Sequence, residues 1–130
     1  MKSKKGFTLV ELMIVMVIIG ILLSLLLPGV FSARQEALKT QTASNLRQCG
    51  IGLYAYAKNN NGVLPATLEA LKEDGYITDN TVFKDSGGTL FDFTAASGNL
   101  YDMTSTAVLV TDTDTGYELR ADGSVNTSGS

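Results

Sequence analysis

The apolar residues of this chain are concentrated in one long run near its amino end. From Phe7 to Leu27, twenty-one residues contain a single charged side chain, that of Glu11. A helix rises about 1.5 Å per residue, so this run would cover roughly 30 Å, the thickness of the hydrocarbon core of a bilayer. Residues 7–27 are therefore predicted to form a membrane-spanning helix.

After Leu27 the chain becomes more polar, but apolar residues recur at helical spacing. Steps of three or four residues join them into one seam, which consists of Leu38, Thr42, Leu46, Cys49, Leu53 and Ala57. The three asparagines and the glycine of residues 59–62, followed by Pro65, are residue types that end helices. We therefore predict one helix from about Phe7 to Lys58, in which residues 28–58 form an amphipathic continuation.

Residues 59–130 are predicted to form a small globular region. A short helix is expected after Thr67 and is ended by Gly75. Three segments rich in β-branched and aromatic residues are expected to be strands, namely Thr89–Phe93, Ala107–Thr111 and Tyr117–Arg120. A hairpin is predicted through Asp112–Gly116, and Asp122-Gly123 starts a further turn. The expected fold class is α+β, with a long amino-terminal helix and a small antiparallel sheet packed on its second half.

Charge is distributed unevenly within the net charge of −3. Residues 28–58 hold four bases and one acid, or +3, whereas residues 59–130 hold three bases and eleven acids, or −8. An acidic region of this kind argues against a nucleic-acid surface, because Lys and Arg are needed to neutralise phosphates. Three lysines precede Phe7 and no further base occurs before Arg34, which predicts a single-pass protein with a cytoplasmic amino terminus.

The chain offers little for catalysis. It contains no histidine, the commonest general base, and neither a Gly-rich phosphate loop nor Cys/His metal spacing. Cys49 is the single cysteine, so no intramolecular disulfide can form. We expect its thiol to be a small buried apolar group of the seam. The chain is not expected to be an enzyme.

The start of the apolar run carries a distinctive motif, GFTLVE, at residues 6–11. A lone charged group at the centre of a membrane helix costs on the order of 2.5–3.5 kcal/mol, but Glu11 lies near the cytoplasmic end. Cleavage of the Gly6–Phe7 bond would give Phe7 a cationic amine, the partner that a carboxylate needs where water is absent. A short basic leader ending in glycine, then FTLVEL and a long apolar run, resembles the class III signal of type IV pilins and type II secretion pseudopilins.

This resemblance implies how the amino end is processed. In that family a prepilin peptidase cuts after the glycine and methylates the new amine. By resemblance, residues 1–6 are a leader peptide, Gly6–Phe7 is the cleaved bond and Phe7 is the N-methylated residue. Glu11 would form an assembly salt bridge with the terminal amine of a neighbouring subunit, although the amine of its own chain is another candidate partner.

Two further positions match residues that many family members use to loosen the helix, Gly20 and Pro28. Pro28 also removes one amide donor and crowds the carbonyl of Ser24, so a kink or a locally opened turn is expected there. An ordinary export signal has an apolar core of about 7–15 residues, whereas this core runs for sixteen residues after Glu11. A cleavage site at Val30–Ser32 remains as a weak alternative.

A metal site is a separate expectation. Asp112 and Asp114 stand two apart before a glycine, which is the opening spacing of a calcium loop, and Asp122 could approach from the next strand. The resemblance adds that major pseudopilins bind calcium in their carboxyl-terminal region. The pattern is incomplete, because Gly123 stands where an EF-hand-type loop needs an acid. A solvated turn without metal is the alternative.

Three functions stay open at this point. The chain is predicted to be a structural subunit that polymerises into a type IV pilus-like helical filament. The alternative is the major pseudopilin of a type II secretion or DNA-uptake apparatus, and the third is a membrane-anchored binding module that never polymerises. Many type IV pilins carry a carboxyl-terminal cystine, so the lone cysteine of this chain shifts weight toward pseudopilins.

The resemblance also implies partners and location. The partners would be further copies of the chain, the prepilin peptidase, the membrane, and an inner-membrane assembly platform with its cytoplasmic ATPase. The subunit would wait in the inner membrane and then move into a cell-surface pilus or a periplasmic pseudopilus.

Overall fold

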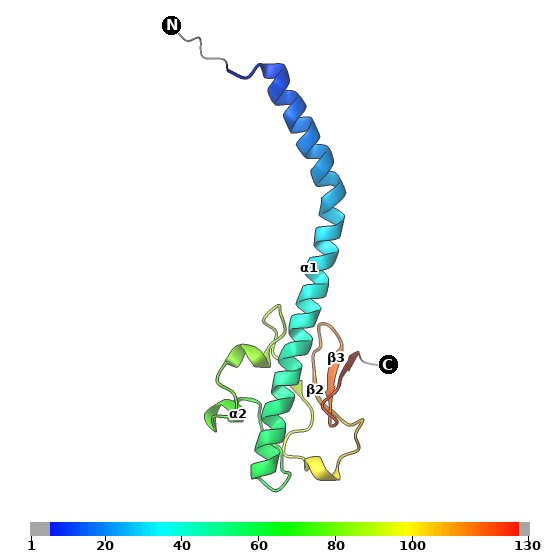
Figure 1. The fold of residues 1–130 in the computed structure, drawn as a ribbon. Coiled ribbons are helices and arrows are strands. Elements are labelled where there is room, and N and C mark those ends of the chain that lie inside the picture. The colour runs from blue at the N-terminus through cyan, green and yellow to red at the C-terminus, as the bar shows by residue number, and fades with distance from the viewer. Residues whose placement is uncertain (1–5, 128–130) are drawn as a thin grey trace. The chain divides into compact units, whose positions relative to one another are not determined.

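The structure is a computed structural model that describes residues 6–127 of the 130-residue chain. Its main element is the helix α1, Leu9–Asn59. The chain divides into two compact units, Met1–Ala37 and Leu38–Ser130, which we call the stem and the head. The expected α+β class is confirmed, because a long amino-terminal helix is followed by a small antiparallel sheet (Figure 1).

The stem consists of the first part of α1 and the residues that precede it. Its large apolar side chains are exposed along the whole described length, from Phe7 at 85% to Phe31 at 60%. The helix is continuous through Gly20 and Pro28, so the locally opened turn predicted at Pro28 is absent from the structure. Proline has a backbone φ close to that of a helix, and one missing hydrogen bond does not interrupt a ladder of this length.

The head is built on the second part of α1. In Figure 1, α2 (Glu69–Glu73) lies on one side of this part of the helix, and β2 (Val108–Thr111) and β3 (Tyr117–Arg120) lie on the other. The helix residues that are buried there are Thr42, Leu46, Cys49, Gly50, Gly52, Leu53 and Ala57. The predicted seam is therefore confirmed except at Leu38, which is 38% exposed because it lies at the edge of the head.

Two glycines allow the head to approach the helix closely, and the seam analysis missed both. A Cβ atom added to Gly52 would lie 2.7 Å from the Cδ1 atom of Ile77, and one added to Gly50 would lie 3.1 Å from Cδ1 of Leu119. Interiors are close-packed, so a contact at the first of these distances requires a neighbour to move. The glycines are thus places where side chains of the head fill the space next to the helix backbone.

The connection after α1 is held by short helical turns. Gly75 adopts φ of +80° and ends α2, and the amides of Tyr76 and Ile77 both donate to the carbonyl of Leu71, as expected. The expected cap at Thr67 is wrong, because the N-cap position is Leu68 and it makes no side-chain cap. Two 3-10 helices follow, η1 (Asn80–Phe83) and η2 (Leu100–Asp102).

The sheet is a four-stranded antiparallel meander in the order β1-β2-β3-β4. Its strands are β1 (Asp92–Phe93), β2 (Val108–Thr111), β3 (Tyr117–Arg120) and β4 (Val125–Thr127). Two predicted strands are confirmed closely, whereas only the last two residues of Thr89–Phe93 are paired as a strand. Leu109, Val110 and Leu119 are fully buried in the core that the sheet shares with α1.

The predicted hairpin between β2 and β3 is confirmed and is closed by the buried carboxylate of Asp112. This carboxylate accepts hydrogen bonds from the amides of Asp114 (3.3 Å) and Thr115 (3.1 Å) and from the hydroxyl of Thr115. Gly116 follows with φ of +73°, and its amide donates to the carbonyl of Asp112 at 2.9 Å. A buried carboxylate with three donors is a structural element of the turn.

Cys49 is fully buried in the head core, as predicted. Its thiol donates to the carbonyl oxygen of Val82 with an Sγ···O distance of 3.1 Å. Burial raises the pKa of the Cys49 thiol to about 12, because the thiolate would lose its hydration. The thiol is therefore neutral and protected in the folded head.

We predict that Cys49 reacts with a maleimide only when the head unfolds. The unfolded thiol has a pKa of about 8.5, so the stability that depends on the neutral thiol is complete below that pH and is lost as the pH rises toward 12. Labelling of the full-length protein in detergent, with and without denaturant, measures the reactivity of the thiol. Denaturation at pH 8 and pH 10, with Cys49→Ala as the control, measures the loss of stability as the pH rises. Rapid labelling of the folded protein would contradict the prediction.

We also predict that Asp112→Ala destabilises the head by about 1.5–3 kcal/mol, the usual contribution of hydrogen bonds to a charged group. Thr113→Ala in the same hairpin is the matched control, because Thr113 is exposed. Denaturant titration of both variants in detergent measures the difference. Equal stability of the two variants would show that the Asp112 carboxylate does not maintain the turn.

Candidate functional site

The bond between Gly6 and Phe7 lies just before α1, outside regular secondary structure. Gly6, Phe7 and Thr8 are all exposed, and no heavy atom lies within 4 Å of a Cβ built on Gly6. An exposed, irregular peptide bond is one that a peptidase can bind in extended form. The remaining leader residues, with their three lysines, lie outside the described part of the chain.

Thr8 caps the helix that follows this bond. Its Oγ1 atom accepts a hydrogen bond from the amide of Glu11 at 3.2 Å, and its carbonyl accepts from the amide of Leu12 at 3.2 Å. Thr8 is thus the N-cap residue and Glu11 the third helical residue, which is the spacing of a capping box. The sequence analysis missed Thr8, although Thr-x-x-Glu before an apolar run is a recognisable signal.

Glu11 is exposed in the first turn of α1. A negative charge at this end of a helix is favourable, because the free amides of the first turn carry partial positive charge. Glu11 therefore has a local function, at the start of its own helix, beside the intermolecular pairing that the resemblance implies. Any test of the pairing has to separate these two functions.

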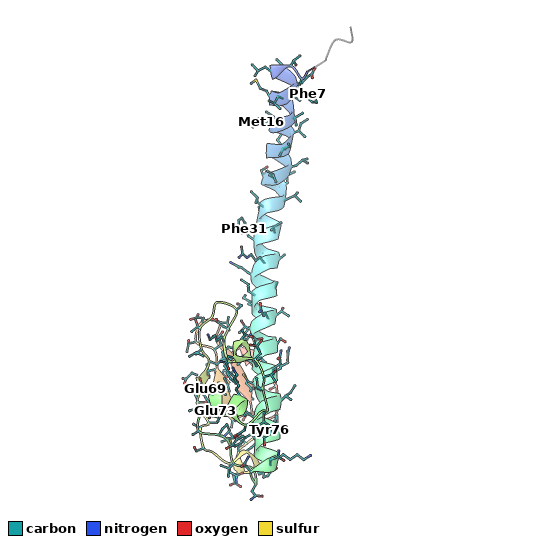
Figure 2. The ribbon with its side chains drawn as sticks, turned by 90° about the vertical axis from the view of Figure 1, so that its left-hand side faces the viewer. Phe7, Met16, Phe31, Glu69, Glu73 and Tyr76 are labelled. Carbon is teal, nitrogen blue, oxygen red and sulfur yellow. The ribbon has the colours of Figure 1, made fainter. Side chains whose placement is uncertain are left out.

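The apolar side chains after Glu11 have no cover within the described chain. Between Gly6 and Thr127, α1 is the one helix long and apolar enough to cross a membrane, and its most apolar window is not buried at all. Figure 2 shows Met16 and Phe31 projecting from this part of the helix. An apolar surface of this extent has to be covered by lipid or by other protein. This part of the helix therefore fits the role of a membrane anchor in a precursor.

The three candidate metal ligands are not brought together. Asp112 and Asp114 share the hairpin before β3, whereas Asp122 lies in the turn after β3, so a whole strand separates it from the pair. Asp114 accepts from the hydroxyl of Thr89 at 2.8 Å. Asp122 accepts from the amide of Ser124 at 2.9 Å and from its hydroxyl at 2.6 Å. Among residues 6–127, no group of three or more acidic, Cys or His side chains is placed to hold a metal ion.

The comparison with protein families matches the amino end. Residues 1–27 match the sequence model of a family described as "Prokaryotic N-terminal methylation motif". The match includes the Gly6–Phe7 bond, the Thr8 cap and Glu11. No solved structure is significantly similar to the chain.

Curated relatives extend the similarity further along the chain. The chain is 33% identical over 78 residues to ComG operon protein 3 homolog of Bacillus licheniformis, which covers 60% of this chain and 79% of the relative. It is 38% identical over 72 residues to competence protein ComGC of Halalkalibacterium halodurans, covering 55% and 70% of the two chains. Type II secretion system core protein G of Pseudomonas aeruginosa is 35% identical over 71 residues, but this match spans only 49% of that protein.

An exposed bond before the apolar helix, a match to the methylation motif and relatives covered over most of their length agree with one another. The chain belongs to the family of type IV pilin-like proteins and type II secretion pseudopilins that carry the prokaryotic N-terminal methylation motif.

Proposed function

We propose that this chain is the precursor of a structural subunit that polymerises into a helical filament through its apolar helix. The observation that supports this most is the stem, where a long apolar helix begins directly after an exposed Gly6–Phe7 bond and has no cover of its own. Packing of such helices side by side would bury this surface and replace lipid as the covering medium. This role requires no catalysis by the chain.

We infer a two-stage history for the subunit. In the first stage the stem is held in the inner membrane with its amino end in the cytoplasm, where a prepilin peptidase cleaves Gly6–Phe7 and methylates the Phe7 amine. In the second stage an assembly platform with a cytoplasmic ATPase moves the subunit into the filament. The helix is continuous through Gly20 and Pro28 in the single chain, so any loosening at these positions would belong to the second stage.

The kind of filament is the second part of the proposal. The sequence predicts a surface pilus subunit, with a pseudopilin of a secretion or DNA-uptake apparatus as the alternative. The relatives are named for competence and for type II secretion, and the matches span more of the competence proteins. These names favour the pseudopilin-like alternative. Deletion of the gene, followed by assays of transformation, protein secretion and surface fibres, distinguishes a DNA-uptake pseudopilus, a secretion pseudopilus and a surface pilus.

Processing of the amino end can be tested by a substitution at Gly6. Replacement of Gly6 by leucine should block cleavage, because a large side chain beside the scissile bond obstructs the peptidase. Mass spectrometry of the membrane-bound protein should then find the full-length chain, whereas the wild-type chain should begin at methylated Phe7. A wild-type chain that begins at Met1 or after Ser32 would contradict the proposed site.

The intermolecular pairing of Glu11 can be tested by its removal. In a filament the stems exclude water, so an unpaired charge there costs several kcal/mol, whereas a charge paired with a Phe7 amine is tolerated. We expect Glu11→Ala to be inserted and cleaved normally but to give few filaments. The sheared filament fraction, compared with processed subunit in membranes by immunoblot, measures this.

The control for this experiment is Glu11→Gln. Glutamine can occupy the same capping-box position without a charge, so it keeps a side chain that can cap the helix and removes the charge that the ion pair needs. Low filament yield from both variants supports the pairing. Normal yield from Glu11→Gln would assign the effect to the helix cap, and loss of cleavage in either variant would move the role of Glu11 to the peptidase.

Calcium binding at Asp112 and Asp114 remains a prediction from the sequence. If the hairpin binds calcium, the melting temperature of the full-length protein in detergent should rise when calcium is added, and Asp114→Ala should abolish the rise. An unchanged melting temperature at millimolar calcium would leave Asp112 as a residue that closes the turn.

A further inference from the structure

The head carries a groove of about 250 Å³ between α1 and the segment that leads into η1. Residues of the helix and of this segment line it together, among them Gln48, Ile51, Gly52, Ile77, Asp79 and Val82. Ligand pockets for small molecules usually have about 300–1,000 Å³, so this groove is more suited to a protein side chain than to a whole ligand.

Ile51 makes the groove unusual. Its side chain is 70% exposed, although Ile77 and Val82 beside it in the groove are buried. A single exposed apolar residue needs no explanation, but an exposed isoleucine that adjoins an apolar groove is typical of a contact surface. Ile77 packs closely against the helix at Gly52, so the two walls of the groove are in tight contact beside it.

The helix α1 offers a matching segment at residues 31–38, beyond the predicted membrane span and at the end of the stem. Phe31 is 60% exposed and Leu38 is 38% exposed, and Arg34 lies between them in the sequence. Figure 2 shows Phe31 on the helix. Residues 31, 34 and 38 are spaced by three and four positions, so they lie on one face of α1. This face combines an aromatic ring, a guanidinium group and a leucine side chain.

The region that contains residues 31–38 and the region that supplies residues 76–82 of the groove carry opposite net charge. Residues 28–58 have a net charge of +3, and residues 59–130 have −8. In the groove, Asp79 caps η1 by accepting from the amide of Thr81 at 2.9 Å. This hydrogen bond lowers the pKa of Asp79, so its carboxylate is negatively charged at neutral pH.

We propose that this groove receives residues 31–38 of a second copy of the chain, with Phe31 packed against Ile51 and the Arg34 guanidinium paired with the Asp79 carboxylate. The proposal rests on the proposed filament function and names one surface through which subunits meet. Phe31 and Ile51 belong to the same helix and are separated by several turns, so they cannot meet within one copy.

The groove contact and the Glu11 pair would involve different neighbours. If Glu11 pairs with the Phe7 amine of another copy, the helices of the two copies are offset along their axes by four residues, or about 6 Å. If Phe31 of one copy contacts Ile51 of another, the helices of these two copies are offset along their axes by twenty residues, or about 30 Å. A helical assembly gives each subunit several neighbours at different axial offsets, so both contacts can form in one filament.

Cysteine crosslinking of the full-length protein in its own cells tests the contact directly. We expect the double variant Phe31→Cys/Ile51→Cys to form a ladder of covalent multimers on mild oxidation, and neither single variant to form more than dimers. The natural Cys49 is buried and does not contribute. Phe31→Cys/Leu90→Cys is the matched control, because Leu90 is 55% exposed but does not line the groove.

Charge variants test the ion pair. Asp79→Asn removes the charge and keeps a residue that caps helices well, so the head should remain folded while filament yield falls. Asp102→Asn, at an exposed acid in η2 outside the groove, is the control and should not lower the yield. Arg34→Asp should lower the yield, and Arg34→Asp/Asp79→Arg should restore it in part.

These experiments test the groove contact and the filament function separately. Normal filaments without the Phe31–Ile51 ladder, or an equal ladder from the Leu90 control, would overturn the groove contact and leave the filament function intact. Loss of membrane insertion in Arg34→Asp would also overturn it, because Arg34 would then act at the lipid surface. Absence of filaments from the wild-type chain in its own cells would refute the filament function itself.

Discussion

The physical constraint on which this protein depends is the cover of the apolar half of its long helix. From Leu9 to Leu27 the side chains are exposed in the single chain, and one charge interrupts them. Such a surface is unstable in water, because the transfer of each CH₂ group out of water is favourable by about 0.8 kcal/mol. Lipid and the helices of other copies are both apolar, so transfer from one to the other is possible without an intermediate in water.

The same helix has two different partners along its length. Up to Ala37 it belongs to the stem and offers apolar side chains to its surroundings. After Leu38 it becomes the centre of the head, where Leu46, Leu53 and Ala57 are fully buried. A domain of fewer than about 80 residues gains little stability from a single hydrophobic core, so use of the helix as part of the core helps to make this small head possible.

Several functions depend on the few residues at the start of the helix. The peptide bond before Phe7 is exposed, as the proposed cleavage requires, and Thr8 caps the helix. Glu11 lies at the position where a carboxylate favours the helix start and where the proposed amine of a neighbour would be paired. This overlap explains why a charged residue is tolerated at the edge of an apolar run.

The sequence by itself determined the features that depend on local pattern. These are the membrane-length run, the helical seam, the hairpin around Asp112 and the motif at Gly6–Glu11, because period, composition and turn residues act over a few positions. Only the tertiary structure decided what depends on distant contacts. Gly50 and Gly52 have no apolar side chain to mark them, yet they receive Leu119 and Ile77 from remote segments. Asp122 is close to Asp112 in sequence but is kept from it by the intervening strand, and Ile51 adjoins a groove whose other wall comes from residues 76–82.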